Sequence, residues 1–323
     1  MQQLVEKIKK IKTYINDIIS IIKKYNPNTK CTSPKKLKYV AEEMENIILE
    51  NSQIEVNYMR DVVGSQFYIA MQVPIYFRKE SIEFEVDTND RASISVSGAG
   101  TDIFDNGLSG IRKINIPIPN TKVNCEGWKP SNIVIRSNSN FTKFNSQNQN
   151  NIIAIQGNMI GIENLNSAFI ANRNLRVIDL RNIESTNNAD MLAECNNLIN
   201  ATLSFKENVK YDATEMFYAC DNMRYLKLDF SNISIATDML AECYSLEKIE
   251  IPKDSTIPNK LNLTDTAIQP KELIEFINNL KKIDEEQIIY VNEKLYNSFS
   301  TVQLNSFKSK GYKIDIFKDF GDE

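Results

Sequence analysis

The chain contains no histidine among its 323 residues. Serine and cysteine hydrolases that rely on an imidazole base are therefore excluded, and so are metal sites built on imidazole ligands. The 42 Asp and Glu residues could supply the two carboxylates that glycoside hydrolysis requires at a fixed separation. No pair of acids is singled out by its spacing, so we expect no catalytic residue and rank a glycan-degrading enzyme low.

Cysteine and Asx clusters give equally little support for a metal or redox site. The five cysteines are Cys31, Cys125, Cys195, Cys220 and Cys243. Their odd number argues against a disulfide framework, and the last three recur at equivalent positions of a repeat, which predicts a buried ladder of small thiols. Asp87-Thr88-Asn89-Asp90 could suggest a calcium loop, but an isolated Asx cluster at the end of a strand is more often a turn. We predict no metal and no cofactor.

The charge and hydropathy patterns exclude two further classes of partner. A net charge of −4 and a pI near 5.3 provide no basic patch for nucleic acid. No apolar run is long enough to cross a bilayer, so we expect no membrane insertion. Residues 1–12 carry charges throughout and do not resemble a signal peptide. The odd number of cysteines fits reduced thiols made in a cytoplasm.

Residues 152–255 contain an internal repeat. Four aligned segments start at Ala168, Met191, Met216 and Met239, at nearly even intervals along the chain. Apolar residues recur 7, 10 and 12 positions after each start. This pattern predicts that each unit holds a short helical piece followed by a strand, and that the units stack into a solenoid. Asp190, Glu215 and Asp238 each precede a start, where we expect them to lie at the N-terminus of a short helix and to be stabilised by its dipole.

The strands of the repeat determine the candidate ligand-facing residues. By alternation, the residues 9, 11 and 13 positions after each start point away from the core. These positions include Val177, Asp179, Arg181, Asn200, Thr202, Ser204, Tyr225, Lys227, Asp229, Lys248 and Glu250. From them we select as candidates Asp179, Arg181, Thr202, Tyr225, Lys227 and Lys248. Tyr225 with Lys227 is the best anchor, because an amphipathic ring gives contact area at low entropic cost. The alternative is that all of these are solvated polar positions.

The first fifty residues carry a heptad pattern. Its apolar seam is Leu4, Ile8, Ile11, Ile15, Ile18, Ile22 and Tyr25. Isoleucine at both core positions of the heptad favours a coiled coil of three or four helices over one of two, and we place a trimer first. A second amphipathic helix after Pro34 would complete a hairpin, so the alternative is that the seam packs against this helix within one chain.

Residues 51–150 alternate in short β-branched and aromatic runs, which predict a β-sandwich-like domain, with Ser137–Asn151 as a polar loop or linker. Near the C-terminus the pattern predicts helices over 269–282 and 301–309 and strands over 288–291 and 312–317, the second helix being ended by Gly311.

The predicted fold class is multidomain α+β: a helical hairpin or coiled coil over 1–50 for oligomerisation or attachment, a small all-β domain over 51–150, and a leucine-rich-repeat solenoid over 151–323 with an α/β cap at about 260–318.

Several segments resemble known families. The repeats resemble the bacterial-surface (BspA-like) leucine-rich repeats found in adhesins and in phage structural proteins. The run VNYMRDVVGSQFYIAMQVPIYFRKESIEFEV resembles the opening strands of lectin-like jelly rolls of phage tail proteins. The runs LTDTAIQPKELIEFINNL and LYNSFSTVQLNSFKSKGYKIDI, with Lys310-Gly311-Tyr312 before the last strand, are similar to the ending of phage-borne proteins of this repeat class.

These resemblances imply a non-enzymatic virion structural protein, assembled in the host cytoplasm: a homotrimeric tail or head fibre, spike or baseplate appendage. Its partners would be other copies of itself, other virion proteins and a host-surface protein or glycan, bound at the repeats. The alternative is a bacterial leucine-rich-repeat adhesin or protein-interaction module, and a tail glycan depolymerase ranks below both.

Overall fold

The computed structural model describes residues 66–72, 81–98, 103–117, 130–137, 142–149 and 152–317. The heptad seam between residues 4 and 25, and the whole predicted segment 1–50, lie outside them. Gly64–Met71, Lys79–Ile118 and Ser131–Glu323 form one compact unit, and the remaining residues, which form a second, are almost all outside the described ranges. The fold below is that of the first unit.

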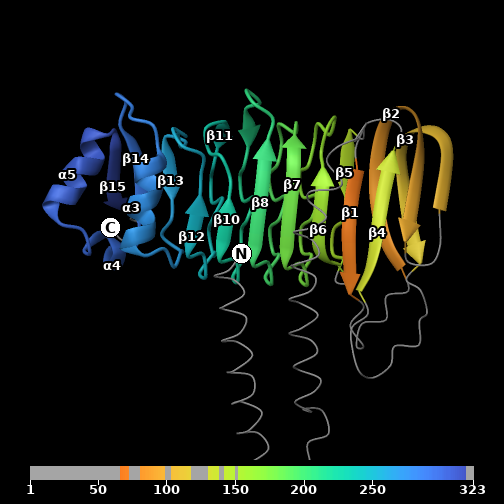
Figure 1. Ribbon diagram of the computed structural model, residues 1–323, viewed down its shortest axis with the longest axis horizontal. Coiled ribbons are helices and arrows are strands. Elements are labelled where there is room, and N and C mark those ends of the chain that lie inside the picture. The colour runs from red at the N-terminus through yellow and green to blue at the C-terminus, as the bar shows by residue number, and fades with distance from the viewer. Residues whose placement is uncertain are drawn as a thin grey trace, which may run out of the picture. The chain divides into compact units, whose positions relative to one another are not determined.

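The predicted α+β fold class is wrong, because the described residues are mostly strands (Figure 1). Three helices occur in them, α3 (Pro270–Asn279), α4 (Glu293–Tyr296) and α5 (Thr301–Ser309), and all three belong to the C-terminal cap. Helices are scarce because the repeats, which make up most of the described chain, contain strands and turns but no helix.

One sheet of ten strands organises the unit. In spatial order its strands are β12 (Lys248–Glu250), β10 (Tyr225–Lys227), β8 (Asn200–Phe205), β7 (Val177–Ile183), β6 (Ile152–Asn158), β1 (Gln66–Gln72), β4 (Pro130–Ser137), β2 (Ser81–Gly98) and β3 (Ile103–Pro117), with β5 (Lys143–Asn145) paired to β2. Neighbours from β6 to β12 are parallel, whereas β1 pairs antiparallel with β6, and β2 pairs antiparallel with β3, β4 and β5. The sheet therefore contains strands from both sides of residue 150, where the sequence predicts a boundary between the β-sandwich-like domain and the repeats.

Each repeat unit forms one coil with a strand in this sheet. Ile178, Ala201, Leu226 and Ile249, which share one offset in the repeat, are direct partners in the parallel register. All four are buried. A narrower parallel ladder on the other side of the coils joins Lys143, Asn164, Asn187 and Asp212, and ends in the pair β9 (Tyr211–Asp212) and β11 (Ile233–Ile235). The sequence offsets thus correspond to the stacking of the coils.

The predicted helical piece in each unit is wrong, because the segment forms turns. In the first three units every second backbone N–H of the segment is used by the next coil. The N–H groups of Ser167, Phe169 and Ala171 donate to the carbonyls of residues 189, 191 and 193, at 2.8–2.9 Å. An N–H that bonds the neighbouring coil cannot also bond the carbonyl four residues back, so an α-helix cannot form.

This ladder also explains a row of acids with unusual backbone. Asp190, Glu215 and Asp238 have φ of 53°, 50° and 48°, in the left-handed region, and occupy the same place in successive coils as Ser167. The expectation that they lie at helix N-termini and are stabilised by a dipole is therefore wrong, because no helix begins there.

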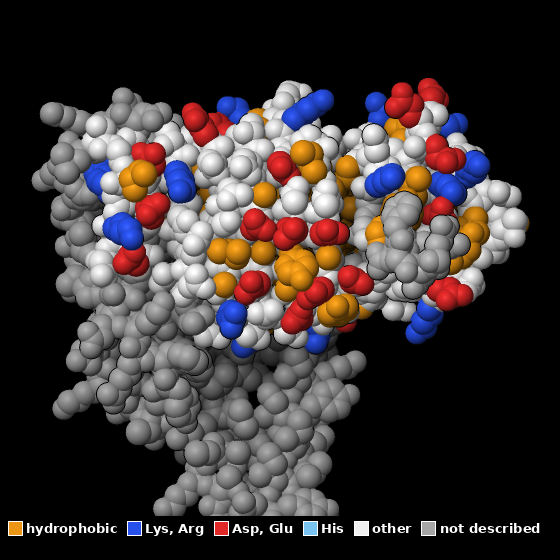
Figure 2. Space-filling model, turned by 180° about the vertical axis from the view of Figure 1, so that it is seen from behind, with side chains coloured by type: hydrophobic (Ala, Val, Ile, Leu, Met, Phe, Trp, Pro, Cys, Tyr) orange, Lys and Arg blue, Asp and Glu red, His pale blue; other side chains and the backbone are white. Residues whose placement is uncertain are grey.

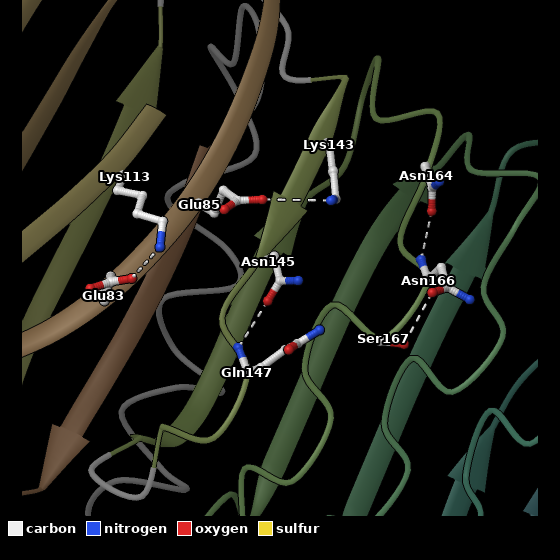
Figure 3. Close-up of polar contacts among 9 residues, drawn as sticks. All are labelled: Glu83, Glu85, Lys113, Lys143, Asn145, Gln147, Asn164, Asn166 and Ser167. Carbon is white, nitrogen blue, oxygen red and sulfur yellow. Dashed lines mark hydrogen bonds and ion pairs between the residues drawn. The ribbon is translucent and has the colours of Figure 1, made fainter. Parts of the chain in front are cut away.

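The first coil begins earlier than the sequence indicated. The sequence predicts a polar loop or linker over Ser137–Asn151, but this segment contains β5. Phe144 of β5 is fully buried, and its ring lies 5.6 Å, centroid to centroid, from the ring of Phe169. Asn145 and Asn164 open equivalent turns: their Oδ1 atoms accept the N–H of Gln147 at 3.0 Å and of Asn166 at 2.8 Å (Figure 3).

The strand pair β2–β3 covers this first coil. Val86 and Ile114, on its inner side, are buried against the core. On its outer side Lys113 pairs with Glu83 at 3.3 Å, and Lys143 pairs with Glu85 at 3.6 Å (Figure 3). Thr88, part of the segment considered for calcium, is buried and accepts a hydrogen bond from Arg112 at 2.9 Å.

The C-terminal cap closes the other end. Its parallel sheet has the order β13 (Lys260–Asn262), β14 (Gln287–Val291) and β15 (Tyr312–Ile316), with α3 packed beside β12. The predicted helices and strands of the cap are present within a few residues of their expected bounds, and α4 is an addition. Helix α3 buries Leu273, Phe276 and Ile277, while α5 begins with a capping box between Ser300 and Gln303.

Candidate functional site

We call the outward side of the parallel strands β6, β7, β8, β10 and β12 the strand face. Along β7 the burial alternates, with Ile178, Leu180 and Ile183 inside, while Asp179 and Arg181 remain partly exposed. The same alternation holds in β8 and in β10, where Tyr225 and Lys227 flank the buried Leu226. All six candidate residues lie on the strand face, since Thr202 and Lys248 follow the same pattern.

Two rows cross the strand face in register. The first consists of Gln156, Asp179, Thr202, Lys227 and Glu250. The second consists of Ala154, Val177, Asn200, Tyr225 and Lys248. Gln156 was not among the sequence candidates, because β6 belongs to a coil whose start was not recognised. The alternation of apolar and polar residues from 152 to 158 was the available signal.

On β7 the charges neutralise each other. Arg181 donates from Nε and Nη2 to the two carboxylate oxygens of Asp179, at 3.1 and 3.0 Å. The Asp179 side chain is 20% exposed. Burial raises the pKa of Asp179 to about 6, and the charge of Lys227 two strands away acts in the opposite direction. At neutral pH the pair is a bidentate ion pair, which fixes both side chains.

On β10 and β12 a second group of side chains is joined around Glu250. Lys227 forms an ion pair with one Glu250 oxygen at 2.8 Å, and the Tyr225 hydroxyl donates a short hydrogen bond to the other. These bonds, from Lys227 first and Tyr225 second, lower the pKa of Glu250. Burial and the same carboxylate raise the pKa of Tyr225. Nζ of Lys248 lies 3.8 Å from a carboxylate oxygen of Glu275 in α3, so the cap supplies a charged partner to the β12 edge of the strand face.

Between these two groups, β8 presents Asn200, Thr202 and Ser204, which we call the β8 column. Thr202 lies between Asp179 and Lys227, and Asn200 lies between Val177 and Tyr225. Within the described part of the chain, no side-chain hydrogen bond involves any of the three residues of the β8 column. The column therefore has free donors and acceptors between two neighbours whose polar groups are already paired.

Opposite the strand face lie the turns of the coils, which we call the turn face. Figure 2, seen from behind the main sheet, shows acidic side chains gathered in rows there. One row contains Asp190, Glu215 and Asp238, and the pKa of Glu215 is raised by burial and by the carboxylates on either side. No group of three or more Cys, Asp or Glu side chains in the described ranges is placed to hold a metal ion.

The three repeat cysteines form the predicted ladder beneath this face. Cys195, Cys220 and Cys243 are free and buried, and their thiols donate to carbonyls of the preceding coil at 3.2–3.3 Å. Burial raises the pKa of Cys195 and Cys243 to about 12, and it raises the pKa of Cys220 well above its ordinary value. These thiols are structural, because the reactive form of cysteine is the thiolate.

Among the described helices, none has the length and apolar character needed to cross a membrane. No protein family, curated protein or solved structure matches this chain.

Proposed function

We propose that the protein is a non-enzymatic structural component of a bacteriophage virion, a tail or head fibre, spike or baseplate appendage, whose BspA-like leucine-rich repeats contact the host surface through the strand face. The observation that carries this proposal is the strand face itself. It presents regularly spaced polar side chains on five parallel strands, which β1, β4, β2 and β3 continue as antiparallel strands at one end and which the cap follows at the other. Such an extended, stacked surface is how solenoid proteins bind large partners.

The state of the carboxylates supports binding in preference to hydrolysis. On the strand face Asp179 is held by Arg181, and Glu250 is held by Tyr225 and Lys227. A glycosidase needs one carboxylic acid and one carboxylate that face the substrate across a gap of suitable width. Because the carboxylates of Asp179 and Glu250 are bound by neighbouring side chains, they fit a recognition surface better than a pair of catalytic acids.

The proposed appendage is a homotrimer joined through the heptad seam of residues 4–25. Light scattering on the whole chain and on a chain that lacks residues 1–50 tests this. We expect a mass near three times the monomer mass of 37.0 kDa for the whole chain, and the monomer mass after truncation. A monomer in both cases would contradict the trimeric appendage and favour a single-copy interaction module.

A further inference from the structure

We propose that the β8 column, Asn200, Thr202 and Ser204, is the binding site for a neutral glycan. This inference rests on the proposed role of the strand face in recognition, and it specifies the ligand class and the residues that contact it.

The first argument is the supply of unused hydrogen bonds. The column offers two hydroxyl groups and one amide, each able to donate and accept, and none of them makes a side-chain hydrogen bond within the described residues. Its neighbours differ, since Asp179 is bound by Arg181 on one side and Tyr225 and Lys227 are bound by Glu250 on the other. A ligand gains hydrogen bonds at the column without breaking any that exist.

The second argument is the charge balance of the face. Arg181 pairs with Asp179 at 3.0 Å and Lys227 pairs with Glu250 at 2.8 Å. Lys248 pairs with Glu275 of α3 at 3.8 Å, so each of these charges has an opposite neighbour. A strongly charged ligand would have to compete with these pairs, and it would face a charge of its own sign wherever it succeeded. The electrostatics therefore favour an uncharged ligand.

The third argument separates a glycan from a peptide. Peptide recognition usually depends on apolar or aromatic anchors buried in pockets. The row through Thr202 supplies instead amides, hydroxyls and paired charges, and in the neighbouring row Asn200 lies between the small aliphatic Val177 and the ring of Tyr225. Vicinal hydroxyls of a sugar match side chains that both donate and accept, and a sugar ring can pack against tyrosine.

The test uses the whole chain and two matched double variants. In the strand-face variant, Thr202→Val with Ser204→Ala removes two hydroxyl groups and keeps the β-branched shape at residue 202. In the control variant, Thr237→Val with Ser245→Ala makes the same changes away from the strand face, at two residues whose side chains also make no hydrogen bond in the described chain. Circular dichroism and thermal unfolding first establish that both variants fold.

Binding is then measured to immobilised neutral oligosaccharides of glucose, galactose, mannose, rhamnose and N-acetylglucosamine, and to sialylated and phosphorylated counterparts. We expect binding to at least one neutral oligosaccharide, about tenfold weaker in the strand-face variant and unchanged in the control. Raising the salt concentration should have little effect, because no net charge is involved.

Three results would overturn the assignment: no binding to any neutral oligosaccharide, binding confined to the charged ones, or equal loss in both variants. These results are independent of the oligomer mass. A trimer that binds no neutral glycan contradicts the ligand assignment alone, whereas a monomer whose glycan binding depends on the β8 column contradicts the trimeric appendage alone.

Discussion

Replacing Gly311 by alanine should destabilise the C-terminal cap by about 1–4.5 kcal/mol. Gly311 has φ of +100°, which L-residues rarely adopt. A Cβ atom there would lie 2.4 Å from Cγ1 of Ile283 and 2.6 Å from the Ile283 carbonyl oxygen. The side-chain atom can rotate away, but the carbonyl oxygen belongs to the backbone, so the chain itself has to move.

The magnitude follows from three contributions. The unfavourable φ costs about 1–2 kcal/mol, and crowding against Ile283 costs roughly 1–3 kcal/mol more. Alanine restricts the unfolded chain, which offsets about 0.5–1 kcal/mol. The same turn carries the bonds from Ile283 N–H to the Lys310 carbonyl, at 3.0 Å, and from Gln287 N–H to the Gly311 carbonyl, at 2.9 Å. A displaced backbone weakens these bonds and the start of the β14–β15 pairing.

Urea unfolding followed by circular dichroism, together with hydrogen exchange of the amides in β14 and β15, measures the effect. Gly110→Ala is the matched control, because Gly110 has φ of +94° and a Cβ there would meet no atom within 4 Å. It isolates the cost of φ, about 1–2 kcal/mol before the unfolded-state offset. If Gly311→Ala costs no more than Gly110→Ala, the crowding argument is refuted.

Three further outcomes are expected. Lys310→Met should lower the free energy of unfolding in urea by about 1 kcal/mol, because Nζ of Lys310 donates to the carbonyls of Ile277 and Asn278 near the end of α3, at 2.8 and 2.9 Å. Lys308→Met is the control: it removes an exposed ion pair with Glu286 at 3.6 Å and should cost less than roughly 0.5 kcal/mol. The raised pKa of Asp179, about 6, means that the folded state binds its proton more tightly than the unfolded state, so the free energy of unfolding should rise as the pH falls from 6 to 4. Asp179→Asn should remove this rise in the free energy of unfolding, which is at most about 3 kcal/mol. If the pH profile of the variant is unchanged, the rise does not come from Asp179. The three repeat thiols should react with a thiol reagent only when the protein unfolds, because they are buried. Mass spectrometry of the labelled peptides measures this, and fast labelling of any of the three in the folded protein would show that its thiol is accessible to solvent.

The sequence determined those features that depend on burial at a fixed spacing. The shared offset of Ile178, Ala201, Leu226 and Ile249 predicted which residues stack, and the register confirms it. The orientation of the six candidate residues followed from the same alternation, because side chains of a strand point to opposite faces in turn. The cap was predictable too, since its helices carry their own amphipathic pattern and capping residues.

Only the tertiary structure decided where the backbone hydrogen bonds of the repeats go. The segment before each strand has an apolar pattern that suits a helix, yet in the first three units its alternate N–H groups bond the next coil, as Phe169 N–H bonds the carbonyl of Met191. That partner is not local, so propensity and periodicity cannot reveal it. The left-handed backbone of Asp190, Glu215 and Asp238 is a consequence of this ladder.

The polar first coil escaped prediction for a related reason. Asn145 and Asn164 open equivalent turns, and these two residues lie closer together along the chain than the starts of the later units do. Phe144 is the buried aromatic residue of this first coil. Asn, Ser and Gln in a coil look like a linker until the neighbouring coil supplies partners for them, as Asn172 does for the N–H of Gln149 at 2.6 Å. Periodicity therefore specifies which side chains are buried, whereas the stacking of whole coils specifies the conformation of the backbone between them.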